Sequence, residues 1–227
     1  MFKADYLGIH ENKFRQLKKE GKPGWSSEDE INEMLACLDK AFLEEKHAES
    51  GKLLELGCGS GGLTLRLSQR GFEVYGIDIS PTAITWAKEK ATEQAIKADF
   101  REGNVLDLPY PDDYFDIVVD GHCLHCIIGD DRKSFFSNAY RVLKNEGLFI
   151  VMTMCGDPGE EEVKKYIDPA TRCMVIDGIA GRYFGKPEDI LDEIKSAGFI
   201  IKSWEINHDA ENKQDGLRAA ARKSHVL

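Results

Sequence analysis

The sequence contains no apolar run long enough to cross a lipid bilayer. Its longest charge-free apolar stretch lies around residues 148–155, whereas a membrane-spanning helix needs about 20 predominantly apolar residues. Residues 1–5 also lack the pattern of a signal peptide. We therefore expect a cytoplasmic protein that has no membrane partner.

The chain also lacks the features of a disulfide-rich secreted protein and of a nucleic-acid-binding protein. Its six cysteines occur in a chain of 227 residues rather than in a small secreted scaffold, so reduced thiols are expected. Acidic residues outnumber basic ones by 40 to 30, which gives a net charge of −10. Because this charge repels phosphate backbones, we expect no nucleic-acid partner.

Length and composition indicate one compact domain over residues 1–227. A chain of this length buries a sizeable core, and an apolar content of 42% is ordinary for a globular protein. No internal repeat or low-complexity tract is evident. The sequence gives no indication of the oligomeric state.

A glycine-rich turn that follows a short apolar strand is the most informative motif. Residues 53–62 read Leu-Leu-Glu-Leu-Gly-Cys-Gly-Ser-Gly-Gly, and helix-like apolar spacing follows. Glycines let the backbone approach a ligand closely, and free amides at a helix start favour an anionic group. Gly57, Gly59 and Gly61 fit the pattern G-x-G-x-G, while Gly57, Gly59 and Gly62 fit the dinucleotide pattern G-x-G-x-x-G.

A second predicted strand, residues 73–78, ends in an acid. Asp78 lies 17 residues beyond Gly61, and a carboxylate there can accept hydrogen bonds from both hydroxyls of a ribose. This placement suits NAD and S-adenosylmethionine (SAM) equally well. The glycine turn and Asp78 together therefore leave both cofactors open.

Four further segments resemble the class I SAM-dependent methyltransferases, particularly the small-molecule branch. They are residues 78–84, 103–110, 114–119 and 141–147, which stand in the family's order and approximate spacing. The resemblance covers roughly residues 50–155. It implies SAM as the cofactor and transfer of a methyl group to an O, N or S atom of a small-molecule acceptor, with release of S-adenosylhomocysteine.

The order of predicted elements is an alternation of strands and helices. Helices are expected after the N-cap signals at residues 26–27 and at 80–81, around 132–143 and at 187–197. Strands are expected at 53–56, 73–78, 100–105, 115–120, 148–154, 199–206 and, less cleanly, 217–222. Such alternation favours right-handed crossovers and a mostly parallel sheet. The resemblance implies a Rossmann-like α/β fold with seven strands in the order 3-2-1-4-5-7-6 and helices on both faces.

The resemblance also assigns cofactor-binding residues. Gly57, Cys58, Gly59 and Gly61 would line the methionine part of SAM. Glu55 would brace the turn or reach the amino group of SAM through water.

The ribose and adenine contacts come from the next two strand ends. Asp78 would bind the ribose diol and Ile79 would lie on the adenine. Asn104 and the Val105 backbone would meet the polar edge of the adenine. Because the family more often has Asp where Asn104 stands, this part of the pattern departs from the family.

The reaction centre is expected at residues 120–126, beyond the carboxyl end of the fourth strand. His122 is the first candidate for a general base because its unperturbed pKa is about 6.5. Asp120 and His125 are further catalytic candidates, and Asp120 is also assigned to the cofactor site. Orientation of the reactants alone is an alternative to acid–base catalysis. Neighbouring His and Cys residues cannot readily converge on one ion, so no metal site is predicted.

Two segments are expected to cover the site: an N-terminal lid over about residues 1–25 and a cap over about residues 156–186. Trp25 could form an aromatic wall, and Arg182 and Tyr183 could lie at the open side. A carboxylate-bearing acceptor would give Arg182 a bidentate partner. Packing of the lid and a solvated arginine are the alternatives.

Three other functions stay open at this point. An NAD-type oxidoreductase would suit the second glycine pattern. A SAM-binding partner subunit without catalysis would keep the fold and lose the chemistry. A protein substrate is the third alternative, because an acidic rim could attract basic peptides.

Overall fold

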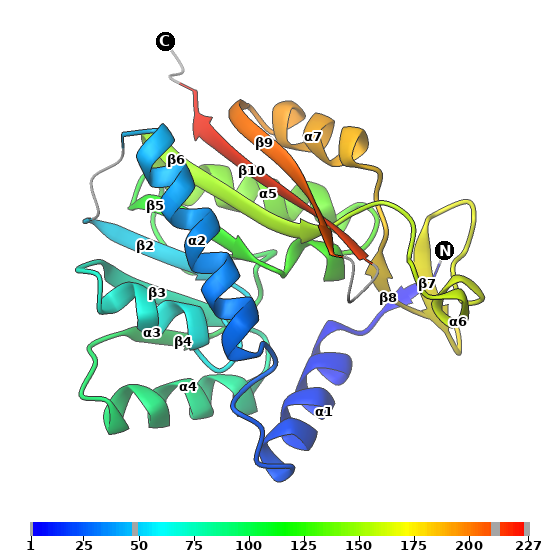
Figure 1. Cartoon of the computed structure of the whole chain (residues 1–227), viewed down its shortest axis with the longest axis horizontal. Coiled ribbons are helices and arrows are strands. Elements are labelled where there is room, and N and C mark those ends of the chain that lie inside the picture. The colour runs from blue at the N-terminus through cyan, green and yellow to red at the C-terminus, as the bar shows by residue number, and fades with distance from the viewer. Residues whose placement is uncertain (1, 47–49, 210–213, 225–227) are drawn as a thin grey trace.

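A seven-stranded sheet forms the centre of the molecule in the computed structural model of the chain, which describes residues 2–46, 50–209 and 214–224 (Figure 1). Its strands are β2 (Lys52–Leu56), β3 (Glu73–Asp78), β4 (Asp99–Glu102), β5 (Phe115–Gly121), β6 (Leu143–Met154), β9 (Phe199–Asp209) and β10 (Gln214–Lys223). They lie in the order β4-β3-β2-β5-β6-β10-β9. If the seven strands are numbered in chain order, their order across the sheet is 3-2-1-4-5-7-6.

All strands of this sheet are parallel except β10, the last strand in the sequence. β10 runs antiparallel to both β6 and β9, whereas the β2–β3, β2–β5, β3–β4 and β5–β6 pairs are parallel. Parallel pairs need crossover connections, and helices supply them. The predicted α/β fold class is confirmed.

Helices cover both faces of the sheet, as the period-two alternation of strand side chains requires. On one face, Leu54 and Val118 contact α5 (Asp131–Val142) and α7 (Pro187–Ser196) in one buried cluster. On the other face, Leu53 and Ile117 join α2 (Glu28–Glu44) and α3 (Gly62–Ser68) in a second cluster. Adjacent strand residues thus anchor opposite layers of the molecule.

The N-cap signals of two helices act as predicted. The Ser27 hydroxyl accepts a hydrogen bond from the Glu30 amide while the Glu30 carboxylate accepts one from the Ser27 amide, which is a capping box at the start of α2. Ser80 caps α4 (Pro81–Glu93), whose first residue is a proline. A proline fits there because its missing N–H would have no partner in the first turn.

Two predicted boundaries are wrong. The strand expected at 100–105 ends at Glu102, because the Gly103 amide donates to the Asp78 carbonyl and the Asn104 side chain accepts from the Leu106 amide. These bonds form a turn in place of a ladder. The strand expected at 148–154 begins earlier, at Leu143, where it pairs with Phe115 before a register shift.

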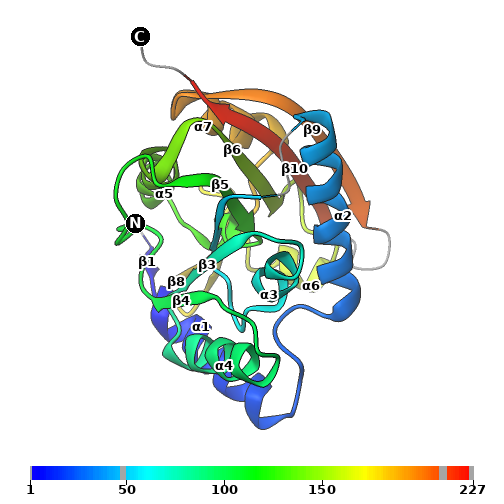
Figure 2. The same ribbon diagram turned by 90° about the vertical axis from the view of Figure 1, so that its left-hand side faces the viewer.

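The two segments expected to cover the site form one small sheet, which the sequence did not predict. β1 (Lys3–Ala4) pairs in parallel with β8 (Ile179–Tyr183), and β8 pairs antiparallel with β7 (Cys173–Ile176). The same region contains the short helix α6 (Glu161–Lys164). After β1, helix α1 (Tyr6–Lys19) runs alongside α4 (Figures 1 and 2).

The described residues contain no membrane-spanning helix, no disulfide bond and no metal-binding cluster. No helix among the described residues is long and apolar enough to cross a membrane. All six cysteines are free. Within residues 2–46, 50–209 and 214–224, no group of three or more His, Cys, Asp or Glu side chains is arranged to hold a metal ion.

Candidate active site

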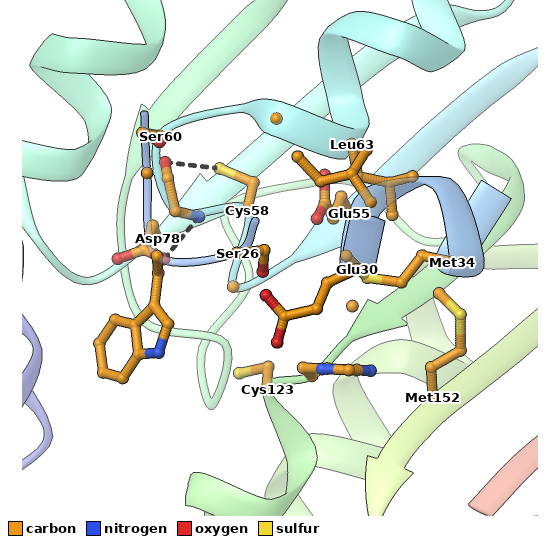
Figure 3. Close-up of a pocket in the computed structure, with 18 of the residues that line it drawn as sticks. Ser26, Glu30, Met34, Glu55, Cys58, Ser60, Leu63, Asp78, Cys123 and Met152 are labelled. Carbon is orange, nitrogen blue, oxygen red and sulfur yellow. Dashed lines mark hydrogen bonds between the residues drawn. The ribbon is translucent and has the colours of Figure 1, made fainter. Parts of the chain in front are cut away.

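A large cleft lies at the carboxyl ends of the central parallel strands (Figure 3). Its volume is about 1770 Å³, whereas pockets that enclose one drug-sized ligand measure about 300–1,000 Å³. Parallel α/β sheets bind ligands at this edge because the strand order reverses there. The cleft has room for two such molecules side by side.

The glycine turn forms one wall of the cleft, between β2 and α3. Gly57, Gly59 and Gly61 have φ values of 69°, 51° and 78°, which are readily accessible to glycine alone. The Gly57 and Cys58 amides donate to the Ile77 carbonyl at 2.9 and 3.0 Å. The turn therefore uses these two amides to attach itself to β3, whereas the amides at the start of α3 belong to Gly62 and the residues after it.

Space as well as conformation requires glycine in this turn. A Cβ atom on Gly57 would lie 2.7 Å from the Cβ of Cys123, and one on Gly59 would lie 3.0 Å from the Phe14 ring. Gly61 differs from the other two, since it caps α3 and lies against Phe100 rather than in the lining of the cleft. Its predicted contact with the cofactor is not seen in this geometry.

Glu55 lies beneath the turn with 3% of its surface exposed. Its carboxylate accepts a hydrogen bond from the Thr64 hydroxyl of α3, and its other oxygen points toward Gly121, where a Cβ would approach to 2.8 Å. Burial raises the pKa of Glu55 to about 8. Glu55 therefore braces β2 against α3 as a neutral acid at pH 7.

Asp78 joins the end of β3 to the glycine turn. One carboxylate oxygen accepts from the Gly59 amide at 2.9 Å and the other accepts from the Ser80 amide at 2.9 Å. Burial raises the pKa of this carboxyl, and the two amide hydrogen bonds oppose that shift. Since a carboxylate has about four lone-pair sites, Asp78 can accept two further hydrogen bonds from a ligand in the cleft.

The residues predicted to surround adenine also line the cleft. Ile79, Asn104 and Val105 all belong to its wall. The side-chain oxygen of Asn104 accepts a hydrogen bond from the Leu106 amide at 3.0 Å. The side-chain NH₂ group is the donor that Asn104 can offer to a ligand.

Asp120 does not line the cleft, contrary to its prediction as a catalytic and cofactor-binding residue. It is fully buried below the turn that follows β5, and one oxygen accepts from the Cys123 and Leu124 amides at 2.9 and 2.8 Å. Burial raises its pKa to about 7. A strand-end acid followed by a tight turn caps the turn's amides, and this local bond competes with a ligand-binding role.

His122 and His125 do line the cleft, with ring centroids 6.3 Å apart. His122 has a φ of 68° and its amide donates to the Met152 carbonyl, an arrangement that projects the imidazole into the cleft, where desolvation lowers its pKa. His125 belongs to the 3₁₀ turn η1 (Leu124–Cys126), and burial lowers its pKa far below the ordinary value. Both shifts favour the neutral form of the imidazole.

The three residues predicted to meet an acceptor separate into two groups. Trp25 and Arg182 line the cleft, and Trp25 also contacts Phe14 edge-to-face with ring centroids 5.4 Å apart. Tyr183 points away and lies under the Arg132 guanidinium at 4.4 Å. Successive residues of a strand face opposite sides, so Arg182 and Tyr183 of β8 cannot both reach the cleft.

Known proteins that resemble this chain include methyltransferases. Residues 54–151 match the family model of a methyltransferase domain. Over 129 residues the chain is 30% identical to the ajmaline N-methyltransferase of Rauvolfia serpentina, a match that covers 54% of this chain and 44% of that relative. The matched part of the chain is a methyltransferase domain of the class I SAM-dependent type. This confirms the predicted family and SAM as its cofactor.

Solved structures share the fold of this methyltransferase. The PH0226 protein of Pyrococcus horikoshii OT3 superimposes with a TM-score of 0.70 at 25% identity, covering 88% of this chain and 93% of that one. A SAM-dependent methyltransferase of Methanosarcina mazei gives 0.68 at 21% identity, covering 81% and 97%. The chain spans about half or less of the length of the curated relatives that it matches.

Sequence reasoning missed the part of the methyltransferase cleft that α2 provides. Ser26, Glu30 and Met34 face the glycine turn across the cleft, and Cys123 and Met152 complete the wall below (Figure 3). The capping box placed the start of α2 correctly but could not show which ligand site it faces. That fact depends on contacts between segments far apart in the chain.

A second missed feature attaches α1 to the methyltransferase core. The buried carboxylate of Glu11 accepts from the Ser80 hydroxyl at 2.7 Å, from the Thr82 hydroxyl at 2.7 Å and from the Thr82 amide at 3.1 Å. Burial raises its pKa, but these hydrogen bonds outweigh burial and hold the pKa at about 2. We call Glu11, Ser80 and Thr82 the latch.

Proposed function

We propose that this chain binds SAM in the cleft beside the glycine turn and transfers its methyl group to an O, N or S atom of a small-molecule acceptor. The observation that carries the proposal is that Gly57, Gly59, Asp78 and Val105 line one cleft. Similarity to an ajmaline N-methyltransferase supports a small-molecule acceptor. The volume of the cleft, about 1770 Å³, supports simultaneous binding of cofactor and acceptor.

The residues present fit SAM better than a dinucleotide. Asp78 keeps two acceptor sites for the ribose hydroxyls, and Ile79 and Val105 offer apolar surface for adenine. A dinucleotide needs turn amides for its pyrophosphate. In this chain the Gly57 and Cys58 amides already donate to a backbone carbonyl, and the match of residues 54–151 to a methyltransferase domain weighs against the NAD-type oxidoreductase.

Bound SAM supplies an electrophilic methyl group on a positively charged sulfur, which becomes a neutral thioether when the methyl leaves. The acceptor atom must present a lone pair and, where it carries a hydrogen, lose a proton. His122 can take this proton because it lines the cleft and its lowered pKa favours the unprotonated imidazole that a general base requires. The α2 wall and the two covering segments, residues 1–25 and 156–186, would orient the acceptor and exclude water.

The decisive experiment measures SAM affinity by calorimetry for the wild type, Asp78→Ala and Asp78→Asn. We expect Asp78→Ala to weaken SAM binding by ~1.5–3 kcal/mol through loss of charge-assisted hydrogen bonds. Asp78→Asn retains an acceptor for the Ser80 amide, so it separates ligand binding from collapse of the turn. Equal SAM affinity in all three proteins would remove Asp78 from the cofactor site.

Turnover is tested separately with labelled SAM and a panel of O, N and S nucleophiles. Transfer of label to any acceptor, lost in Asp78→Ala, supports the enzyme. SAM binding without transfer to any acceptor in a broad panel would instead favour the non-catalytic SAM-binding subunit.

A further inference from the structure

One of the positively charged side chains in the cleft wall differs from the others in its hydrogen bonding. The lysine and arginine side chains that line the cleft are Arg66, Lys90, Arg182 and Arg218. Arg66 and Arg218 each face a glutamate, and Lys90 donates to a serine hydroxyl and a backbone carbonyl. The side chain of Arg182 makes no hydrogen bond or ion pair with any residue that the structure describes. In a chain with 40 acidic residues, an arginine left without a carboxylate partner is available to an external anion.

Buried polar atoms without partners lie in the same wall. The Nδ1 atom of His125 and the hydroxyl of Thr153 have no hydrogen-bond partner among the described residues, although only 7% and 2% of these residues is exposed. Both residues line the cleft. A buried polar atom without a partner is costly, and a ligand that hydrogen-bonds to it removes that cost.

These three residues come from elements that meet at one place. Arg182 lies on β8, His125 on η1 and Thr153 on β6, and η1 contacts both strands. The charge of Arg182 is the largest neighbouring electrostatic influence on His125 after burial. His122, the candidate base, lies next to His125.

We infer that the acceptor is an anion whose carboxylate or phosphate oxygens are bound by Arg182, with His125 and Thr153 supplying hydrogen bonds beside it. The inference rests on the proposed function, since it names the acceptor class of the same cleft. A guanidinium presents its N–H donors in a planar fork that matches two oxygens of such a group. The net charge of −10 repels anions from the molecule as a whole, so recognition has to come from a local cation.

The test uses benzoate and benzamide as probes, because they share a shape and differ in charge. Binding is measured by calorimetry on full-length protein saturated with S-adenosylhomocysteine. We expect benzoate to bind at least about tenfold more tightly than benzamide, and Arg182→Gln to abolish this preference. Arg182→Lys, which keeps the charge without the fork, should retain part of it. Phenyl phosphate in place of benzoate distinguishes a phosphate group from a carboxylate.

Arg101→Gln is the matched control, because Arg101 is exposed, pairs with Asp99 and lies outside the cleft. It should keep the wild-type preference. Equal binding of benzoate and benzamide, binding of no anionic probe, or a preference that survives Arg182→Gln would each overturn the inference. SAM affinity is measured on the same proteins to distinguish failure of the two proposals. If the wild type does not bind SAM, the proposed function itself is refuted.

Discussion

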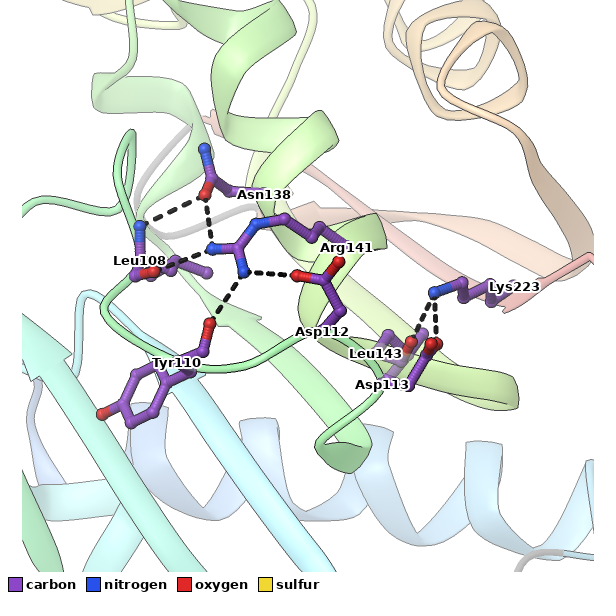
Figure 4. Close-up of polar contacts among 8 residues, drawn as sticks. All are labelled: Leu108, Tyr110, Asp112, Asp113, Asn138, Arg141, Leu143 and Lys223. Atoms are coloured by element: carbon purple, nitrogen blue, oxygen red, sulfur yellow. Dashed lines mark hydrogen bonds and ion pairs between the residues drawn. The ribbon is translucent and has the colours of Figure 1, made fainter.

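Two polar regions of the molecule differ in how completely their side chains are hydrogen-bonded. In the network between α5 and the loop after β4 (Figure 4), Arg141 donates to the Leu108 and Tyr110 carbonyls at 2.8 and 2.7 Å and to the Asp112 carboxylate at 2.9 Å. At the end of β10, Lys223 donates to a carboxylate and a carbonyl in the same way. Each cation of this region is satisfied by the chain itself.

In the cleft the opposite holds for Arg182, His125 and Thr153, which have guanidinium, imidazole and hydroxyl atoms without partners among the described residues. Among the cations of these two regions, the Arg182 side chain is the one that no described residue partners, so we expect it to be available to a ligand.

The largest expected effect concerns the buried acid of the cleft. Glu55 has a pKa of about 8 in the folded protein and about 4.3 when unfolded. Between these values the folded state holds a proton that the unfolded state has lost, so stability falls as pH rises through this window. Glu55→Gln should remove this dependence and, at pH 8, exceed the wild type in stability by up to about 4 kcal/mol.

Urea unfolding of wild type and Glu55→Gln at several values between pH 5 and 8.5 measures the difference. Asp120 contributes in the same direction, with a pKa of about 7, but it is common to both proteins and cancels. Parallel stability curves would show that Glu55 is ionised in the fold.

The next effect tests the comparison directly. Arg141→Met leaves the Leu108 and Tyr110 carbonyls without donors, and we expect it to lower the free energy of unfolding by about 3 kcal/mol. Arg182→Met breaks no bond among the described residues and should change it by less than about 0.5 kcal/mol. Thermal and urea unfolding measure the free energy of unfolding of both variants. If the two variants lose similar amounts of free energy, the distinction between the two regions is refuted.

The smallest effect concerns the latch. Glu11→Gln keeps the shape and loses the charge that the three donors of the latch share with the Arg15 guanidinium at 2.6 Å, so we expect a loss of about 2 kcal/mol at pH 7. Because the folded pKa is about 2, below the unfolded value, this stabilisation is present above about pH 4.5 and disappears as pH falls toward 2. Wild type and variant should therefore converge in acid unfolding experiments, and a gap that persists at pH 2 would assign the loss to packing instead of charge.

Local signals allowed most of the fold to be predicted from the sequence. The capping box at Ser27, the Ser80–Pro81 helix start and the glycine turn depend on neighbours within a few residues, and all three occur where expected. The sheet order followed from the family resemblance and agrees with the observed pairing.

The failures share a physical origin. Tyr183 was expected beside Arg182 because the strand β8 was not foreseen, and strand alternation sends the two side chains apart. Asp120 was placed in the site because its role as a turn cap depends on the backbone of Cys123 and Leu124. In each case the decisive contact is set by backbone geometry that residue types alone do not specify.

The pairing of β1 with β8 has a mechanical consequence. Because β1 pairs with β8, backbone hydrogen bonds join the N-terminal segment to the segment 156–186, and we expect the two to move together if either is displaced. The latch at Glu11 holds the N-terminal segment on α4. The N-terminal segment is thus attached to the rest of the molecule at two places, one made of backbone hydrogen bonds and one of a buried carboxylate.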